Sequence, residues 1–61
     1  MNRTAQALLA ATRTCVGRKG LATTTSRDIT AEAGANLAAI TYHFGSKDRL
    51  VADALLEELR S

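Results

Sequence analysis

The apolar side chains recur at helical spacing in four separate segments of the chain. In the first segment the inward positions follow an i, i+1, i+4, i+7, i+8 pattern, which is one face of an α-helix: Leu8, Leu9, Thr12, Cys15 and Val16. This pattern predicts a helix over about residues 3–18, with Arg18 and Lys19 near the negative end of its dipole. We expect Gly20 to end the helix in the left-handed conformation.

A second, short helix is predicted over about residues 26–33. Thr25 and Asp28 resemble a capping box, in which each side chain accepts a hydrogen bond from the backbone of the other residue. Ile29 and Ala33 are expected to point inward. Gly34 ends this helix, and we expect it to supply both a positive φ and a close approach of the flanking helices.

A third helix is predicted over about residues 37–44. Asn36 is a favourable N-cap, and Gly45 stops the helix. Ile40 and Phe44 are four residues apart and therefore share the face that we expect to be buried.

The fourth helix is expected to begin after Ser46, its N-cap, and to fill residues 47–61 with Asp48 in its first turn. It carries a broad apolar stripe formed by Leu50, Val51, Ala54, Leu55 and Leu59, with Leu56 beside it. A small domain can hardly cover so wide a face. The stripe therefore favours a contact with something outside this segment.

The chain is expected to be all-α, a small helical bundle of the homeodomain-like type: three helices within residues 1–46 plus the start of a connecting fourth helix. At 61 residues it is one small domain of marginal stability. With one Cys and one His it can form neither an internal disulfide nor a four-ligand structural zinc site. No cofactor is predicted. The expected core comprises Leu8, Leu9, Val16, Ile29, Ile40, Phe44, Leu50 and Leu55.

The basic residues are concentrated in the first half of the chain. Residues 1–27 hold five basic and no acidic side chains, whereas residues 28–61 hold three basic and six acidic ones. This asymmetry indicates an anionic partner for the first half. No apolar run approaches the roughly 18 residues of a membrane span, and no secretory signal is visible. We expect a cytoplasmic protein without membrane contact.

The two short helices and the turn at residues 34–36 have the order of a helix-turn-helix. In that arrangement the second helix enters the major groove of double-stranded DNA and the first lies across the backbone. Many αα-hairpins share this order, so on the pattern alone DNA binding and simple helix packing both stay open.

The stretch from Thr25 to Leu50 resembles the DNA-binding heads of the TetR family of regulators. Those heads read Thr, three variable residues, Ile-Ala, then Ala-Gly-Val-Ser, then Tyr-His-Phe or Tyr-x-His-Phe, then a Lys followed by a Leu. The block Tyr42-His43-Phe44-Gly45-Ser46-Lys47 carries most of the resemblance. Ala35-Asn36, Thr30 and Thr41 depart from the usual residues and leave the operator sequence open.

The resemblance implies roles for individual residues. It implies phosphate contacts for Thr25, Ser26, Tyr42, His43 and Lys47. It implies base contacts for Arg27, Leu37, Ala38, Ala39 and Thr41, with Arg27 reaching either a guanine edge or a phosphate. It also implies a homodimer formed through a C-terminal domain after residue 61, and a small-molecule effector that makes the protein a ligand-responsive repressor.

Three classes of function were weighed. A sequence-specific DNA-binding module for transcriptional regulation is favoured. A helical protein-interaction module is the alternative, because something must cover the apolar face of the fourth helix. An enzyme is not expected, since the chain has no Gly-rich phosphate loop, no metal-ligand spacing and no nucleophile beside a base. Cys15 is interpreted as a small buried residue.

Overall fold

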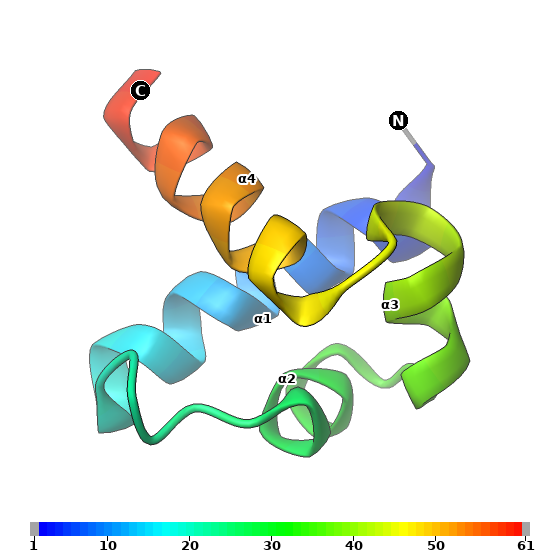
Figure 1. Cartoon of the computed structure of the whole chain (residues 1–61), viewed down its shortest axis with the longest axis horizontal. Helices are drawn as coiled ribbons and strands as arrows, with labels where there is room; N and C mark the ends of the chain where they lie inside the picture. Colours follow the sequence, from blue (N-terminus) through cyan, green and yellow to red (C-terminus); the bar gives the residue numbers. More distant parts are fainter. Residues whose placement is uncertain (1, 61) are drawn as a thin grey trace.

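A computed structural model describes residues 2–60, and this part of the chain contains four helices and no strand (Figure 1). They are α1 (Arg3–Lys19), α2 (Ser26–Ala33), α3 (Leu37–Phe44) and α4 (Lys47–Arg60). The all-α fold is confirmed, and each predicted helix begins and ends within about one residue of its expected limits.

Helix α1 lies at the centre, with α2 and α4 on either side of it and α3 against its N-terminal half (Figure 1). The core where they meet comprises Leu8, Leu9, Ala11, Ile29, Ile40, Leu50 and Ala54. Leu8, Ile29 and Leu50 have no exposed surface at all. Each of the four helices therefore contributes to one continuous cluster, as a single small domain requires.

Two residues expected in the core lie outside it. Leu55 is 40% exposed. It follows Val51 by four residues, and Val51 already lies at the edge of the buried face of α4, so no neighbouring helix covers Leu55. Val16 is only half-buried, because Cys15 takes the inward position in that turn of α1. Phe44 is also only partly buried, but it packs against the core cluster.

The buried polar groups are all satisfied within the described residues. The hydroxyl of Thr12 donates to the carbonyl of Leu8 at 2.8 Å, and that of Thr24 donates to Gly20 at 2.7 Å. Cys15 is buried, with its Sγ 3.5 Å from the carbonyl oxygen of Asp28. It packs as a small hydrophobic residue with a weak donor, which agrees with its interpretation from the sequence.

The turn between α2 and α3 depends on the backbone angle of Gly34. Its φ of 71° and ψ of 33° are left-handed, which disfavours residues with a side chain. A Cβ at this position would meet no atom within 4 Å, so the expected close approach of the helices at Gly34 was wrong. Gly20 also has a positive φ, 84°, but its ψ of 157° places it outside the left-handed helical region that we expected.

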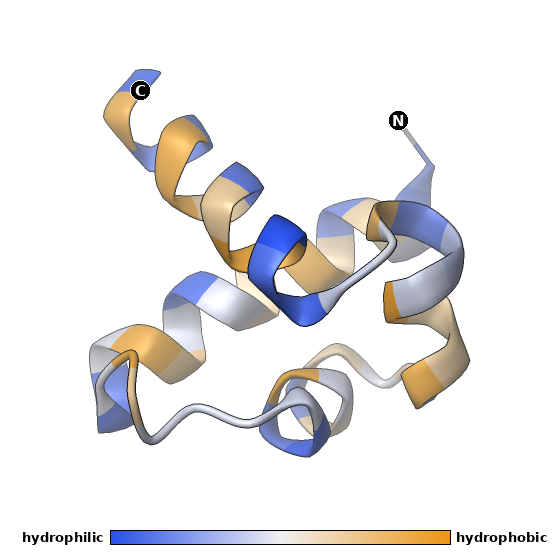
Figure 2. Cartoon of the chain, viewed as in Figure 1, coloured by the Kyte–Doolittle hydropathy of each residue, from blue (hydrophilic) through white to orange (hydrophobic). Residues whose placement is uncertain are grey.

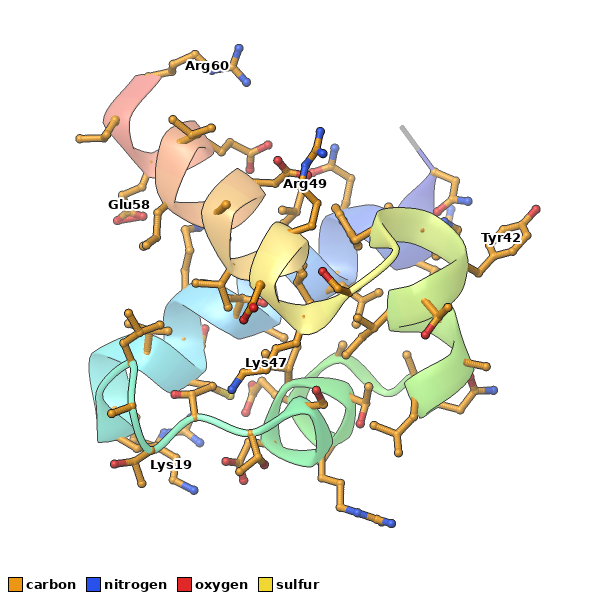
Figure 3. All side chains as sticks on the ribbon, viewed as in Figure 1. Lys19, Tyr42, Lys47, Arg49, Glu58 and Arg60 are labelled. Carbon is orange, nitrogen blue, oxygen red and sulfur yellow. The ribbon has the colours of Figure 1, made fainter. Side chains whose placement is uncertain are left out.

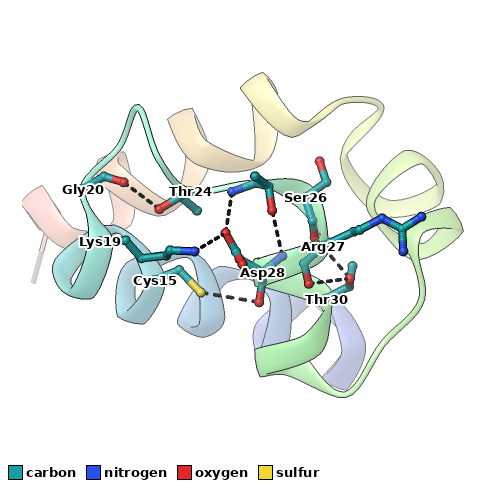
Figure 4. A network of polar contacts seen from close by, with 9 residues as sticks. Cys15, Lys19, Gly20, Thr24, Ser26, Arg27, Asp28 and Thr30 are labelled. Atoms are coloured by element: carbon teal, nitrogen blue, oxygen red, sulfur yellow. Dashed lines mark hydrogen bonds and ion pairs between the residues drawn. The ribbon is translucent and has the colours of Figure 1, made fainter.

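The start of α2 is fixed by the capping box that the sequence predicts (Figure 4). The Asp28 N–H donates to the Thr25 hydroxyl at 3.1 Å, and the Thr25 N–H donates to the Asp28 carboxylate at 2.9 Å. Lys19, at the end of α1, places its Nζ 2.9 Å from the same carboxylate oxygen. The Thr25 N–H, and then Lys19, lower the pKa of Asp28 from its ordinary 3.8 to about 2.

Residues 2–60 were also compared with the requirements of a membrane-spanning helix and of a metal site. No helix within residues 2–60 is long and apolar enough to cross a membrane. Over the same range, no group of three or more His, Cys, Asp or Glu side chains is arranged to hold a metal ion.

The lowered pKa of Asp28 predicts an acid-sensitive contribution to folding. Because the folded-state pKa lies below the ordinary value, the carboxylate stabilises the fold fully above about pH 4, and this stabilisation is lost as the pH falls toward 2. Asp28→Asn should lower the melting temperature at pH 7, and the difference from the wild type should shrink between pH 4 and pH 2. Circular dichroism melts across this pH range measure it.

Asp48→Asn is the matched control, because Asp48 also stands in a first helical turn but makes no ion pair or side-chain hydrogen bond within residues 2–60. We expect it to change the melting temperature less than Asp28→Asn does. A difference between the wild type and the Asp28→Asn variant that stays constant from pH 7 to pH 2 would contradict the role given to the Asp28 carboxylate.

Candidate DNA-binding surface

Helix α3 turns one face to the core and the other to solvent. Ile40 is its buried residue. Of the four positions of α3 expected to face bases, three are exposed, namely Leu37, Ala38 and Thr41. The fourth, Ala39, is half-buried and packs against the core cluster, so the structure does not group it with the other three. The exposed face of α3 is thus narrower than the sequence suggested.

The ion pairs divide the eight basic residues into two groups of four. Arg13 pairs with Glu57 and Glu58, and the other three pairs are Arg18–Glu32, Lys19–Asp28 and Arg49–Asp53. No acidic partner within residues 2–60 contacts Arg3, Arg27, Lys47 or Arg60. The uncompensated positive charge of the domain therefore lies on this second group.

Three of these four unpaired cations stand in the first turn of a helix: Arg3 in α1, Arg27 in α2 and Lys47 in α4. The positive end of the helix dipole makes this the less favourable place for a cation. The arrangement is explained if the three cations face an anion in the functional state. The sequence gives this signal for Arg27 and Lys47, and it indicates a distal phosphate contact as the leading functional use of Arg3.

The N-terminus of α2 keeps several donors free for an anion. The N–H groups of Ser26 and Arg27 donate to no residue in the described part of the chain. The Thr25 hydroxyl accepts the capping hydrogen bond, and its own hydrogen is given to no residue there. The Thr25 N–H differs, since it already donates to the Asp28 carboxylate and is therefore not available to an anion.

The carboxylate at the same helix end does not leave a net negative charge. Asp28 lies close to the donors of Ser26 and would repel an anion there, but Lys19 pairs with it at 2.9 Å. The side chain of Arg27 extends away from this hydrogen-bonded network (Figure 4). The helix end is therefore suited to an anion, with Arg27 reaching beyond it.

Tyr42 and His43 stand at the end of α3 and differ in exposure. Tyr42 is 83% exposed, points away from the domain (Figure 3), and its hydroxyl has no hydrogen-bond partner within residues 2–60. His43 is half-buried, and the two rings meet edge to face with centroids 4.8 Å apart at an angle of 83°. An aromatic residue so exposed adds almost nothing to the core, which leaves its hydroxyl and ring for a partner.

An open groove runs between the first turns of α1 and the side of α3. Its rim carries Arg3 and Thr4 on one side and Tyr42 and His43 on the other. Most of the other lining residues are small: Ala7, Ala33, Gly34, Ala35, Asn36, Ala38 and Ala39. The sequence indicates a distal phosphate contact for Arg3 and no role for Thr4, because only the packing of α1 against α3 brings both residues into the groove that Tyr42 lines.

Two comparisons with known proteins identify relatives of the chain. The family model described as "Bacterial regulatory proteins, tetR family" matches residues 8–58. The "HTH-type transcriptional dual regulator CecR" of Shigella flexneri is 45% identical over 60 aligned residues, which cover 87% of this chain and 26% of that protein. The chain thus spans about a quarter of the length of this curated relative. No solved structure matches it with comparable significance.

The matched residues include both helices of the helix-turn-helix, the turn between them and most of α1 and α4. The all-α fold of the described residues agrees with this match. The chain therefore belongs to the TetR family of bacterial regulatory proteins, as a helix-turn-helix DNA-binding domain.

Proposed function

We propose that this domain reads an operator sequence by placing α3 in the major groove of double-stranded DNA. The observation that carries the proposal is that two unpaired cations, Arg27 in α2 and Lys47 in α4, stand in first helical turns of a domain whose α3 exposes Tyr42. A protein-interaction surface has no need for cations at the positive ends of helix dipoles. Phosphates beside those helix ends offset that unfavourable placement.

The phosphate contacts are assigned to two sets of groups. At the start of α2, the Thr25 hydroxyl and the Ser26 N–H bind one phosphate, and Lys47 contributes its charge. At the end of α3, Tyr42 and His43 bind the backbone through the phenol and imidazole groups. These contacts position α3 on the duplex but carry no sequence information directly.

The base contacts come from α3 and the first turn of α2. Leu37, Ala38 and Ala39 offer only apolar contact, for example with a thymine methyl group, and Ala39 reaches a base only from the edge of the core. Thr41 can donate or accept a hydrogen bond. Arg27 is the one residue of the set whose side chain matches the O6 and N7 atoms of guanine.

The phosphate contacts are tested with Tyr42→Ala/Lys47→Ala. Four to six phosphate contacts predict a slope of about −4 to −5 for log K against log salt on random duplex DNA. We expect the double variant to flatten the slope by about 1, because Lys47→Ala removes one cation, and to lose further affinity, because Tyr42→Ala removes a phosphate-binding hydroxyl. Fluorescence anisotropy at several salt concentrations measures both quantities.

Arg60→Ala is the control, since Arg60 is also exposed and unpaired but lies at the far end of α4 (Figure 3). It should change neither affinity nor slope appreciably. Wild-type protein that does not bind at low salt, or a double variant that binds as well as the wild type, would contradict the proposal.

Arg27→Ala separates base reading from phosphate contact at this residue. If Arg27 reads a guanine, the variant loses about 1–3 kcal/mol on a selected operator and little on random DNA. We expect this outcome, because the side chain extends away from the donors at the start of α2 (Figure 4). Equal losses on both DNAs, with a slope flatter by about 1, would instead assign Arg27 to a phosphate.

We further propose that the complete protein is a cytoplasmic, ligand-responsive repressor that continues beyond α4 into a C-terminal domain for dimerisation and effector binding. Two observations support this. The curated relative is about four times as long as the matched region. The outer half of α4 exposes Leu55, Leu56 and Leu59 at 40%, 56% and 82%. Hydrophobic positions recur along this helix into its outer turns (Figure 2).

The same exposed leucines favour a second candidate, a helical protein-interaction module that uses this face for another protein. The two candidates differ in what covers α4: a domain of the same protein, or a separate partner.

Leu56→Glu/Leu59→Glu distinguishes them. In the present chain the double variant should melt as the wild type does, because both side chains are already largely exposed. In the complete protein it should lower the melting temperature and weaken the dimer, since it buries two charges without partners. Thermal melts and sedimentation velocity on both proteins test this. An unchanged dimer in the complete protein would favour the interaction module.

A further inference from the structure

The groove between α1 and α3 is lined by one cation and by no acidic residue. Arg3 and Thr4 stand on the α1 side, Tyr42 and His43 stand on the α3 side, and no Asp or Glu lines it. Most of its other lining residues are small, among them Ala7 and Ala38, so few side chains fill the groove. A polyanion can enter this groove without meeting a repelling carboxylate.

Arg3 has no partner that would hold its charge inside the domain. It is exposed, it begins α1, and no acidic side chain within residues 2–60 pairs with it. The helix dipole also disfavours a cation at this end. Arg3 is therefore, like Arg27 and Lys47, an unpaired cation in the first turn of a helix, although it is far from them in the sequence.

We propose that Arg3 binds a phosphate of the same DNA strand that Tyr42 and His43 contact, so that this strand runs along the groove. The inference rests on the proposed function and extends it by one contact from α1. A DNA strand carries one negative charge per about 3.4 Å of helix axis. A backbone held at Tyr42 therefore presents further phosphates to the opposite rim, where Arg3 stands.

This contact adds a cation to the phosphate-binding groups on the second side of α3. The start of α2 and Lys47 hold one side of the helix, and Arg3 with Tyr42 and His43 holds the other. A helix fixed by phosphates on both flanks is restrained in depth and in tilt, which sets the side chains of α3 that reach the bases.

Arg3→Gln tests the proposal against Arg60→Gln, which removes the same charge from an exposed, unpaired arginine away from the groove (Figure 3). On random duplex DNA, Arg3→Gln should flatten the salt slope by about 1. The affinity ratio of wild type to variant should then fall about 3.5-fold between 50 and 200 mM salt. Arg60→Gln should leave the slope unchanged. Arg3→Lys keeps the charge and should keep the slope.

The outcomes separate this inference from the function on which it rests. If Tyr42→Ala/Lys47→Ala weakens binding while Arg3→Gln behaves as Arg60→Gln does, the Arg3 contact is overturned and the proposed function stands. If Arg3→Lys loses as much slope as Arg3→Gln, the charge of Arg3 is not the cause, and the contact is again overturned. Wild-type protein that does not bind DNA overturns both. Circular dichroism melts verify that each variant is folded.

Discussion

Helix α3 is held to the rest of the domain by one fully buried side chain, Ile40, with the half-buried Ala39 and Phe44 beside it. An eight-residue helix has little stability of its own in water, so this packing decides whether α3 exists in the right place. It also decides which residues are left for DNA. Because Ile40 faces inward, Leu37, Ala38 and Thr41 face outward, and the surface that we propose to read bases is a consequence of how the helix is anchored.

The basic residues divide in a similar way, into cations that pair within the domain and cations that are left unpaired at its surface. The four paired cations hold helices together or neutralise a carboxylate, as Lys19 does for Asp28 at the start of α2. The four unpaired ones are exposed or half-buried. Surface ion pairs are worth at most about 1 kcal/mol each, so their contribution to stability is small. Their larger effect is to remove charge from some parts of the surface and leave it in others.

Local features of this fold could be predicted from the sequence, and features that depend on packing between helices could not. The caps at Thr25 and Asn36 involve residues three apart, so the sequence alone identified them. The exposure of Leu55 depends on where α1 stops covering α4, and helical periodicity does not contain that information. Arg3 and Tyr42 line one groove only because α1 packs against α3, so the sequence indicates a distal phosphate contact for Arg3 but not the groove that it shares with Tyr42. The close approach of helices expected at Gly34 was wrong for the opposite reason. The positive φ of Gly34 is a local property of the turn, and it accounts for the glycine without any close contact.

The inner half of helix α4 is buried in the core and its outer half is largely exposed, so the two halves are stabilised differently. The inner half is fixed by Leu50 and Ala54, which are fully buried in the common core. The outer half is tied to α1 by Arg13, whose guanidinium lies 2.9 Å from Glu57 and 3.7 Å from Glu58, with all three side chains about a third exposed or more. Such pairs restrain a helix weakly. Burying Leu56 and Leu59 would therefore stabilise the outer turns more than the contacts that these turns have within this domain.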